Sequence, residues 1–325
     1  MARGDSRPPR PATPPLRGAA SVIDLRSRRA LADLVAEPRV PTGAGPDVRP
    51  QTLERLRMEA ELRQAAATGA LAVHVQPGFS LADGEPEGIE LLVRWPTATG
   101  DVRPAADFLP LAEETELIVA VGAWVLDVAC RQLDGWRGWT SGRPPRAWVN
   151  LAGRELRAEG LDVHLRRLAA RWRVRPGELG LEVRHDVLHL LPPEALDRLR
   201  RVLNSGVALA LDDVRTADLA LPVGVRPVLV KIDRGVTAGL ATSAASRARM
   251  AAVVERAHAV GARTHACGVE DSEQLRLARD LGCDAASGYL LSPPGPVEEL
   301  AGRLAQGVAT LRLLLDQELA GRPEV

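Results

Sequence analysis

From about residue 51 onward, short apolar runs typical of β-strands alternate with segments of helical periodicity. Strands that alternate with helices predict a mostly parallel sheet. Eight such runs fit a closed barrel of about 250 residues. An open doubly wound sheet is the alternative, but no glycine-rich phosphate loop follows the first run. We therefore expect an α/β fold, a TIM-like (β/α)8 barrel. The expected strands are 71–76, 89–95, 147–151, 179–183, 207–212, 228–232, 262–266 and 286–291.

The helical segments and the N-terminal region complete the expected organisation. Glycines mark expected helix ends at Gly135, Gly206, Gly261 and Gly282. Residues 1–48 are rich in Pro and Arg without sustained periodicity, which predicts a disordered tail before a barrel domain over 49–325. Within the tail, 20–36 is either a short partner-binding helix or a transient solvated one. The expected helices are 51–68, 118–135, 193–203, 244–259 and 272–281.

Charge and cysteine content restrict the class of partner and compartment. Lys plus Arg equals Asp plus Glu at 42 each, so the chain lacks the basic excess expected of a DNA or RNA binder or of a polybasic membrane anchor. No apolar run approaches the roughly 20 residues of a membrane helix, and no signal-peptide core is visible. Cys130, Cys267 and Cys283 form no CxxC pair, which favours a reducing compartment. We expect a cytoplasmic protein.

Polar side chains follow or interrupt nearly every expected strand from the second to the seventh. In a barrel of this kind the active site lies at the carboxyl ends of the strands. A single acid at a strand end is usually a helix cap or a solvated loop residue, but this serial placement predicts a shared site. Carboxylate and amide oxygens suit Mg²⁺, Mn²⁺ or Ca²⁺ better than zinc, and Lys231 is the chain's one lysine. The set is Glu90, Asn150, Glu182, Asp212, Asp213, Lys231, Asp233 and Glu270.

The same segments resemble a known family. From about residue 51 to 300 the chain resembles the EAL domain of cyclic di-GMP phosphodiesterases. Glu90-Leu91-Leu92 stands where the naming Glu-Ala-Leu lies, and the further segments occur in family order. They read MEAELRQAAATGALAVHVQP, GIELLVRWP, RPAADFLPLAEETELI, WVNL, LGLEV, ALALDD, VLVKID, CGVE and LGCDAASGYLLSPP.

The resemblance implies a barrel of the EAL type that binds cyclic di-GMP and cleaves one phosphodiester by metal-assisted hydrolysis with Mg²⁺ or Mn²⁺. Lys231 matches the family lysine near the attacking water, and we group Glu270 with it as catalytic. Gln76 and Arg94 match nucleotide-contacting positions, and Arg94 could grip a phosphate. The resemblance implies metal ligands at Glu90, Asn150, Glu182 and Asp212, with Asp213 as the acid associated with a second metal.

Four departures set this chain apart from the pattern. Cys267 replaces the first Glu of Ala-Glu-Gly-Val-Glu, the family's acid/base, and a thiol is a poor Mg²⁺ ligand that is normally neutral near pH 7. The loop that would read DDFGTG reads DDVRTA (212–217), so both glycines are gone. His185 replaces the acid that anchors this loop, and Ser287 replaces a glutamine.

These departures leave three functions open. The first is a degenerate EAL domain that binds cyclic di-GMP with a divalent metal and hydrolyses it weakly or not at all. The second is an active phosphodiesterase giving the linear dinucleotide. The third is a protein-interaction domain that no longer binds nucleotide, with a homodimer or a signalling protein as partner. We also expect a packed, inert Cys267 rather than a redox-active one.

Overall fold

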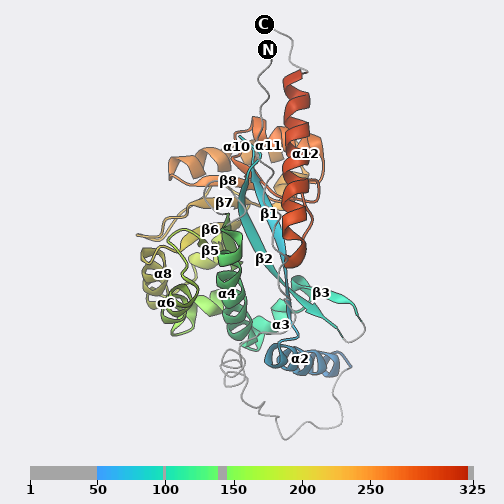
Figure 1. The fold of residues 1–325 in the computed structure, drawn as a ribbon. Coiled ribbons are helices and arrows are strands. Elements are labelled where there is room, and N and C mark those ends of the chain that lie inside the picture. The colour runs from blue at the N-terminus through green and yellow to red at the C-terminus, as the bar shows by residue number, and fades with distance from the viewer. Residues whose placement is uncertain (1–49, 98–99, 138–144, 321–325) are drawn as a thin grey trace, which may run out of the picture.

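The computed structural model describes residues 50–97, 100–137 and 145–320 of the 325-residue chain (Figure 1). The tail predicted for 1–48, and the helix considered for 20–36, lie outside the described residues. Within those residues, no helix combines the length and apolar character needed to cross a bilayer.

The strands close into a barrel, as the sequence predicts. The sheet order is β10-β1-β9-β8-β7-β6-β5-β4-β2-β3, and β1 also pairs with β2, which closes the circle. The strands from β4 to β9 pair in parallel, and β2 pairs in parallel with β4. The strands are β1 (Ala72–Ser80), β2 (Pro86–Pro96), β3 (Val102–Pro104), β4 (Arg146–Asn150), β5 (Leu179–Arg184), β6 (Ala208–Val214), β7 (Leu229–Ile232), β8 (Arg263–Ala266), β9 (Ala285–Ala286) and β10 (Gly295–Pro296).

Every antiparallel pairing in the described sheet involves β1 or the short β3 at the end of β2. Strand β1 runs antiparallel to both β2 and β9. Only residues 81–85 separate β1 from β2, and so short a connection makes a hairpin, which must be antiparallel. One consequence is that Gln76 of β1 lies directly opposite Glu90 of β2.

The last expected strand, 286–291, is wrong in length. Only Ala285–Ala286 is extended, and Ser287 closes the pairing by donating its backbone N–H to the carbonyl of Ala266. Leu290 then bonds to Val269, and Ser292 to Gly288, so the chain turns across the barrel end. These turn hydrogen bonds replace a strand ladder in an apolar run that sequence alone cannot distinguish from a strand.

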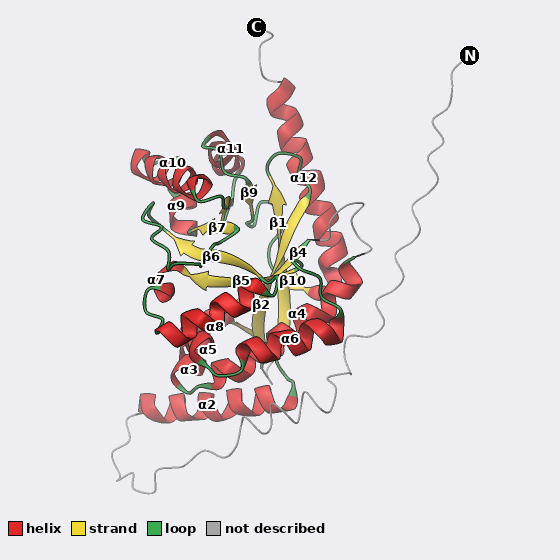
Figure 2. Cartoon of the chain, turned by 90° about the vertical axis from the view of Figure 1, so that its left-hand side faces the viewer, coloured by secondary structure: helices red, strands yellow, loops and turns green. Residues whose placement is uncertain are grey.

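Helices surround the strands on the outside, as Figure 2 shows. Predicted and observed helices agree closely, but Gly135 does not end its helix, because α4 continues to Trp136. Gly206, Gly261 and Gly282 do follow helix ends with positive φ. Helix α2 packs on α3 and α4, and α12 packs beside β1. The helices are α2 (Pro50–Thr68), α3 (Leu109–Glu114), α4 (Leu117–Trp136), α5 (Gly153–Arg157), α6 (Leu161–Trp172), α7 (His185–Leu188), α8 (Pro193–Asn204), α9 (Arg234–Ala238), α10 (Ala244–Ala259), α11 (Ser272–Asp280) and α12 (Leu300–Ala320), with 3-10 turns η1 (Ala105–Asp107) and η2 (Val297–Glu299).

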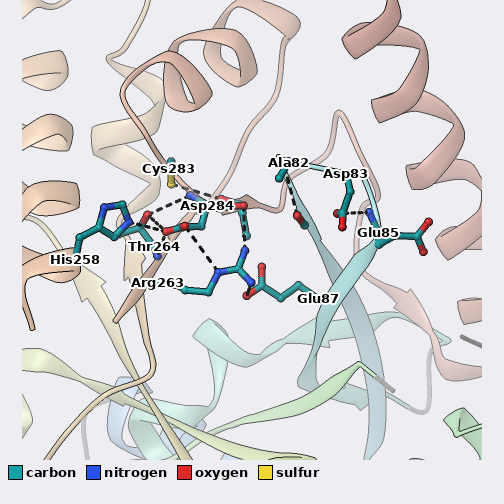
Figure 3. A network of polar contacts seen from close by, with 11 residues as sticks. Ala82, Asp83, Glu85, Glu87, His258, Arg263, Thr264, Cys283 and Asp284 are labelled. Carbon is teal, nitrogen blue, oxygen red and sulfur yellow. Dashed lines mark hydrogen bonds and ion pairs between the residues drawn. The ribbon is translucent and has the colours of Figure 1, made fainter. Parts of the chain in front are cut away.

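A polar network fastens the amino-terminal ends of β8 and β9 (Figure 3). Asp284 accepts hydrogen bonds from the backbone N–H and the hydroxyl of Thr264, at 2.7 and 2.8 Å, and contacts His258 Nε2 at 2.8 Å. Arg263 joins this group to β2 through an ion pair with Glu87 at 3.0 Å. Burial by itself would raise the pKa of Asp284, but the bonds from His258 and Thr264 outweigh it and lower that pKa. The network lies at the amino-terminal end of the barrel. In such folds this end contributes to stability, whereas catalytic residues lie at the opposite end.

We expect Asp284→Asn to lower the free energy of unfolding by about 1–3 kcal/mol at pH 7, because it removes a charged acceptor of several hydrogen bonds. The folded-state pKa of Asp284 is depressed, so its stabilisation is present above the unfolded-state pKa and is lost as pH falls through the folded-state value. Urea unfolding at pH 7 and in acid measures both effects. The matched control is Asp280→Asn on an exposed helical ion pair. An equal loss in the two variants, or a loss that persists in acid, would contradict this role.

Candidate active site

One cleft at the carboxyl ends of the strands brings the expected ligands together. Glu90 of β2, Asn150 at the end of β4, Glu182 of β5 and Asp212 of β6 all line it. Parallel register explains part of this, since Asn150 pairs with Glu182 across β4 and β5. The rest of the wall is largely apolar and comes from β2 and α4, with Val93, Ile118, Val121 and Val125 among the lining residues. The serial strand-end pattern thus corresponds to four side chains that line one cleft, and their function stays a prediction.

The centre of the site is an ammonium held between two carboxylates. Lys231 Nζ lies 2.5 Å from Glu90 Oε2 and 2.7 Å from Glu182 Oε2. Asn150 Nδ2 donates to the other oxygen of Glu90 at 2.8 Å. The side chains of Lys231 and Glu182 are almost completely buried, at 5% and 1% exposure, so these charges are shielded from water. A buried ion pair of this kind holds together because each charge would be far costlier alone.

The charges in this cluster set one another's protonation. Burial alone would lower the pKa of Lys231, but Glu182 and Glu90 outweigh it and raise that pKa well above its usual value. Burial would raise the pKa of Glu90, but the ammonium of Lys231 prevails and lowers it. The pKa of Glu182 is raised well above normal, first by burial and then by the charge of Glu90, with Asp212 adding to it. Glu182 is therefore the acid most in need of another positive charge.

The donor set suits a hard divalent cation. The second oxygen of Glu182, Oε1, is buried and has no hydrogen-bond partner in the described part of the chain. Such an atom is normally satisfied by a donor, a water or an ion. Glu90, Asp212 and Asn150 present further oxygen ligands in the same cleft. Within the described residues, however, no three carboxylate, imidazole or thiol side chains already stand close enough together to hold a metal ion. A cation would therefore have to share Glu90 and Glu182 with Lys231.

Cys267 follows β8 at the edge of this cluster. Burial, reinforced by the negative charges of Asp212, Glu90 and Glu182, raises the pKa of its thiol well above normal even though Lys231 opposes the shift. The thiol is therefore protonated near pH 7. A neutral thiol neither accepts a proton readily nor ligates Mg²⁺.

Asp213 and Glu270 lie apart from the ammonium. Asp213 has positive φ, at 57°, and its carboxylate meets Arg215 Nη2 at 3.1 Å. Arg215 also pairs with Asp233 at 3.4 Å, and Asp233 caps α9 through the N–H of Gly235. Glu270 is exposed, and among the described residues its carboxylate makes no bond to the cluster. A metal role for Asp213 and a catalytic role for Glu270 stay predictions.

The two residues expected to contact nucleotide sit on the hairpin strands. Gln76 lines the barrel interior with Glu90 and Lys231, and its amide donates to the carbonyl of Ser292 at 3.1 Å. Arg94 is half-buried and donates to the carbonyl of Val93, a weak partner for a guanidinium. Burial lowers the pKa of Arg94, while the charge of Glu90 partly restores it. The guanidinium has no carboxylate partner within the described residues, which leaves it available to an anion.

Sequence reasoning missed two buried groups beside the site. His265 of β8, opposite Lys231 in the ladder, contacts Ser287 Oγ at 2.8 Å, and burial, with the charge of Lys231, lowers its pKa to about 3. Glu155 lines the cleft, where burial raises its pKa to about 8, and it accepts from the N–H of Ala152. A histidine within a short expected strand, and an acid at the third position of a helix, were the available signals.

Known proteins resemble this chain over most of the described barrel. The EAL domain family matches residues 59–294. An uncharacterized signaling protein of Caulobacter vibrioides is 34% identical over 249 residues, which are 76% of this chain and 30% of that protein. The bifunctional diguanylate cyclase/cyclic di-GMP phosphodiesterase MucR of Pseudomonas aeruginosa is 34% identical over 257 residues, 78% of this chain and 37% of MucR. The solved PaMucR phosphodiesterase in its c-di-GMP complex gives a TM-score of 0.69 at 31% identity, covering 75% of this chain and 99% of that one. The chain spans about a third of the length of these curated relatives.

We expect Lys231→Met to lower the free energy of unfolding by about 3–5 kcal/mol at neutral pH, because it leaves Glu90 and Glu182 facing each other without a cation. The two acids should then ionise less readily when folded than when unfolded. The loss should therefore shrink as pH falls and the acids protonate. Thermal unfolding from pH 5 to 8 measures the effect, with the exposed Arg276→Met as the control. A loss no larger than that of the control, or one independent of pH, would show that the cluster is not the stabilising centre.

Proposed function

The chain belongs to the EAL domain family, and on this premise we propose that it binds cyclic di-GMP together with a divalent cation, Mg²⁺ or Mn²⁺, and hydrolyses it weakly or not at all. Relatives bear the names of cyclic di-GMP phosphodiesterases, and the neighbouring PaMucR structure is a c-di-GMP complex. The cleft itself supports a ligand of this kind. It joins an apolar wall to a group of oxygen donors, two of which, Glu90 and Glu182, also contact the ammonium of Lys231.

The residues that we expect to contact the nucleotide, Gln76 and Arg94, are not among the positions that depart from the family pattern. The guanidinium of Arg94 offers a planar pair of donors to a phosphate, and no carboxylate competes for it among the described residues. Gln76 exposes an amide to the interior beside Glu90. The cation would be held by Glu90, Asn150, Glu182 and Asp212, where it would polarise a phosphoryl oxygen and acidify a bound water. Lys231 would steady the same acids and offset their charge.

The presence of Cys267 where the family pattern has its acid/base glutamate is the observation that carries the proposed loss of hydrolysis, and burial raises the pKa of this thiol well above normal. A general base must be able to take a proton from the attacking water, and losing one typically costs about 10²–10⁴-fold in rate. The second acid, Asp213, is engaged by Arg215, whose charge occupies its carboxylate. Neither Arg215 nor Ala217 has the positive φ that glycine would permit, so this loop follows its own path. Proton transfer is weakened while the recognition surface persists.

Two alternatives keep specific support. The intact Lys231, Glu90 and Glu182 cluster favours an active, slow phosphodiesterase. A protein-interaction role, through a homodimer or a signalling partner, is favoured by apolar side chains near the loop that follows β6. Val223 there is 87% exposed, and Leu190 after α7 is 70% exposed. Nucleotide binding and turnover distinguish these functions.

We expect isothermal titration with cyclic di-GMP to show one binding event that strengthens with Mg²⁺ or Mn²⁺. Arg94→Gln should weaken binding by about tenfold or more, because a charge-assisted bond to phosphate is lost. The control Arg276→Gln lies on an exposed helix face outside the cleft and should bind as the native chain does. Absence of heat at high micromolar nucleotide would reject the binding function and leave protein interaction.

We expect Cys267→Glu to raise turnover of cyclic di-GMP to the linear dinucleotide by at least about tenfold, since it restores a carboxylate for proton transfer. In the control Cys267→Gln, the glutamine side chain is as long as that of glutamate but carries no charge. This variant should stay as slow as the native chain. Product formation with Mn²⁺ measures both. Rapid multiple turnover by the unmodified chain would instead establish the active phosphodiesterase, and equal rates for the two variants would assign the defect to the loop after β6.

A further inference from the structure

Two histidines lie one helical turn apart outside the cleft. His185 opens α7 and His189 is its C-cap residue, in the sequence His-Asp-Val-Leu-His. Residues four apart on a helix share a face, and here the two Nε2 atoms face each other at 3.4 Å. His185 is half-buried and His189 is exposed, so both nitrogens can be reached from solvent. This pair is separate from the acids of the barrel mouth.

The spacing of the two rings fits a chelated cation. Metal–nitrogen bonds of 2.0–2.1 Å at a tetrahedral angle place the two ligating nitrogens about 3.3 Å apart. The same geometry, with each ring centre lying beyond its nitrogen, places the ring centres about 5.2 Å apart. The Nε2 atoms are 3.4 Å apart and the ring centroids 5.0 Å, with the ring planes at 90°. Both separations agree with a bidentate histidine site.

A direct hydrogen bond accounts less well for this arrangement. A nitrogen-to-nitrogen distance of 3.4 Å is longer than the usual range for such bonds. His185 Nε2 also lies 3.4 Å from the carbonyl oxygen of Ala220, again a long contact. Nε2 of His185 therefore lies near two electron-rich atoms, the carbonyl oxygen of Ala220 and Nε2 of His189, and makes a strong hydrogen bond to neither. A positive charge placed between the imidazoles would satisfy both nitrogens.

We propose that His185 and His189 form a chelating site for a borderline divalent transition cation, of which Zn²⁺, Ni²⁺ and Cu²⁺ are the natural class. Imidazole nitrogen favours these ions, whereas Mg²⁺ and Ca²⁺ prefer oxygen. Asp186, between the two histidines, is already paired with Arg184. Within the described residues no third carboxylate, imidazole or thiol completes the site, so water fills the remaining positions.

The site's position gives it a role in local order. Helix α7 directly follows β5, which carries Glu182, and Ala220 belongs to the segment after β6, which carries Asp212. A cation on His185 and His189 fixes both rings of the connection after β5 beside Ala220, without occupying the cleft.

Calorimetric titration of the full chain with Zn²⁺ tests the site. The experiment uses a Cys267→Ser background, which leaves only the buried thiols of Cys130 and Cys283, and excess Mg²⁺, so that the oxygen donors of the cleft are saturated. We expect one equivalent of Zn²⁺ to bind in the micromolar range. His185→Gln and His189→Gln should each weaken binding by about tenfold or more. His164→Gln on α6, with its own contact to a backbone carbonyl, is the matched control and should leave binding unchanged.

Paramagnetic resonance of bound Cu²⁺ identifies the ligands directly. The proposal expects splitting from two imidazole nitrogens, reduced to one in either glutamine variant. Zn²⁺ binding that is unchanged in both variants, no stoichiometric binding at all, or a Cu²⁺ spectrum without two nitrogens would overturn the proposal. None of these outcomes depends on nucleotide binding, so failure here is distinguishable from failure of the proposed cyclic di-GMP function.

Discussion

The ammonium of Lys231, buried between Glu90 and Glu182, is the contact on which the site and much of the barrel interior depend. The three residues come from β7, β2 and β5, which are not neighbours in the sheet, so the contact spans the inside of the barrel. Neither acid would stay ionised there without the ammonium, and the ammonium would not stay buried without them. The acids proposed to hold a cation therefore also stabilise the interior of the barrel through their contact with Lys231.

Local patterns were sufficient for most of the fold. The helices expected at 193–203 and 244–259 match α8 and α10 within a residue, because periodicity and end signals act within each segment. The sheet is mostly parallel, as predicted, and the antiparallel direction of β1 follows from the short hairpin that joins it to β2. The length of the last expected strand was wrong. The apolar run after Ala286 turns because Val269 and Gly288 supply its hydrogen bonds, which no local pattern encodes.

The residues of the candidate site likewise divide into those that the sequence pattern could place and those that it could not. Strand-end placement was enough to predict that Glu90, Asn150, Glu182 and Asp212 share one cleft. It could not predict that Asp213 would turn toward Arg215, since that outcome depends on one backbone angle and on Asp233, which lies just after β7. The buried states of His265 and Glu155 were equally hidden, because a pKa reflects three-dimensional burial rather than sequence position.

The thiol at position 267 is best understood through this charge balance. Glu90, Glu182 and Asp212 already share one ammonium, and burial, reinforced by the charges of Glu90 and Asp212, raises the pKa of Glu182. A further carboxylate at 267 would add another negative charge to this group. A protonated thiol adds none, so Lys231 has fewer acids to balance. A thiol at this position therefore withholds a proton acceptor and, for the same electrostatic reason, avoids repulsion with Glu90, Glu182 and Asp212.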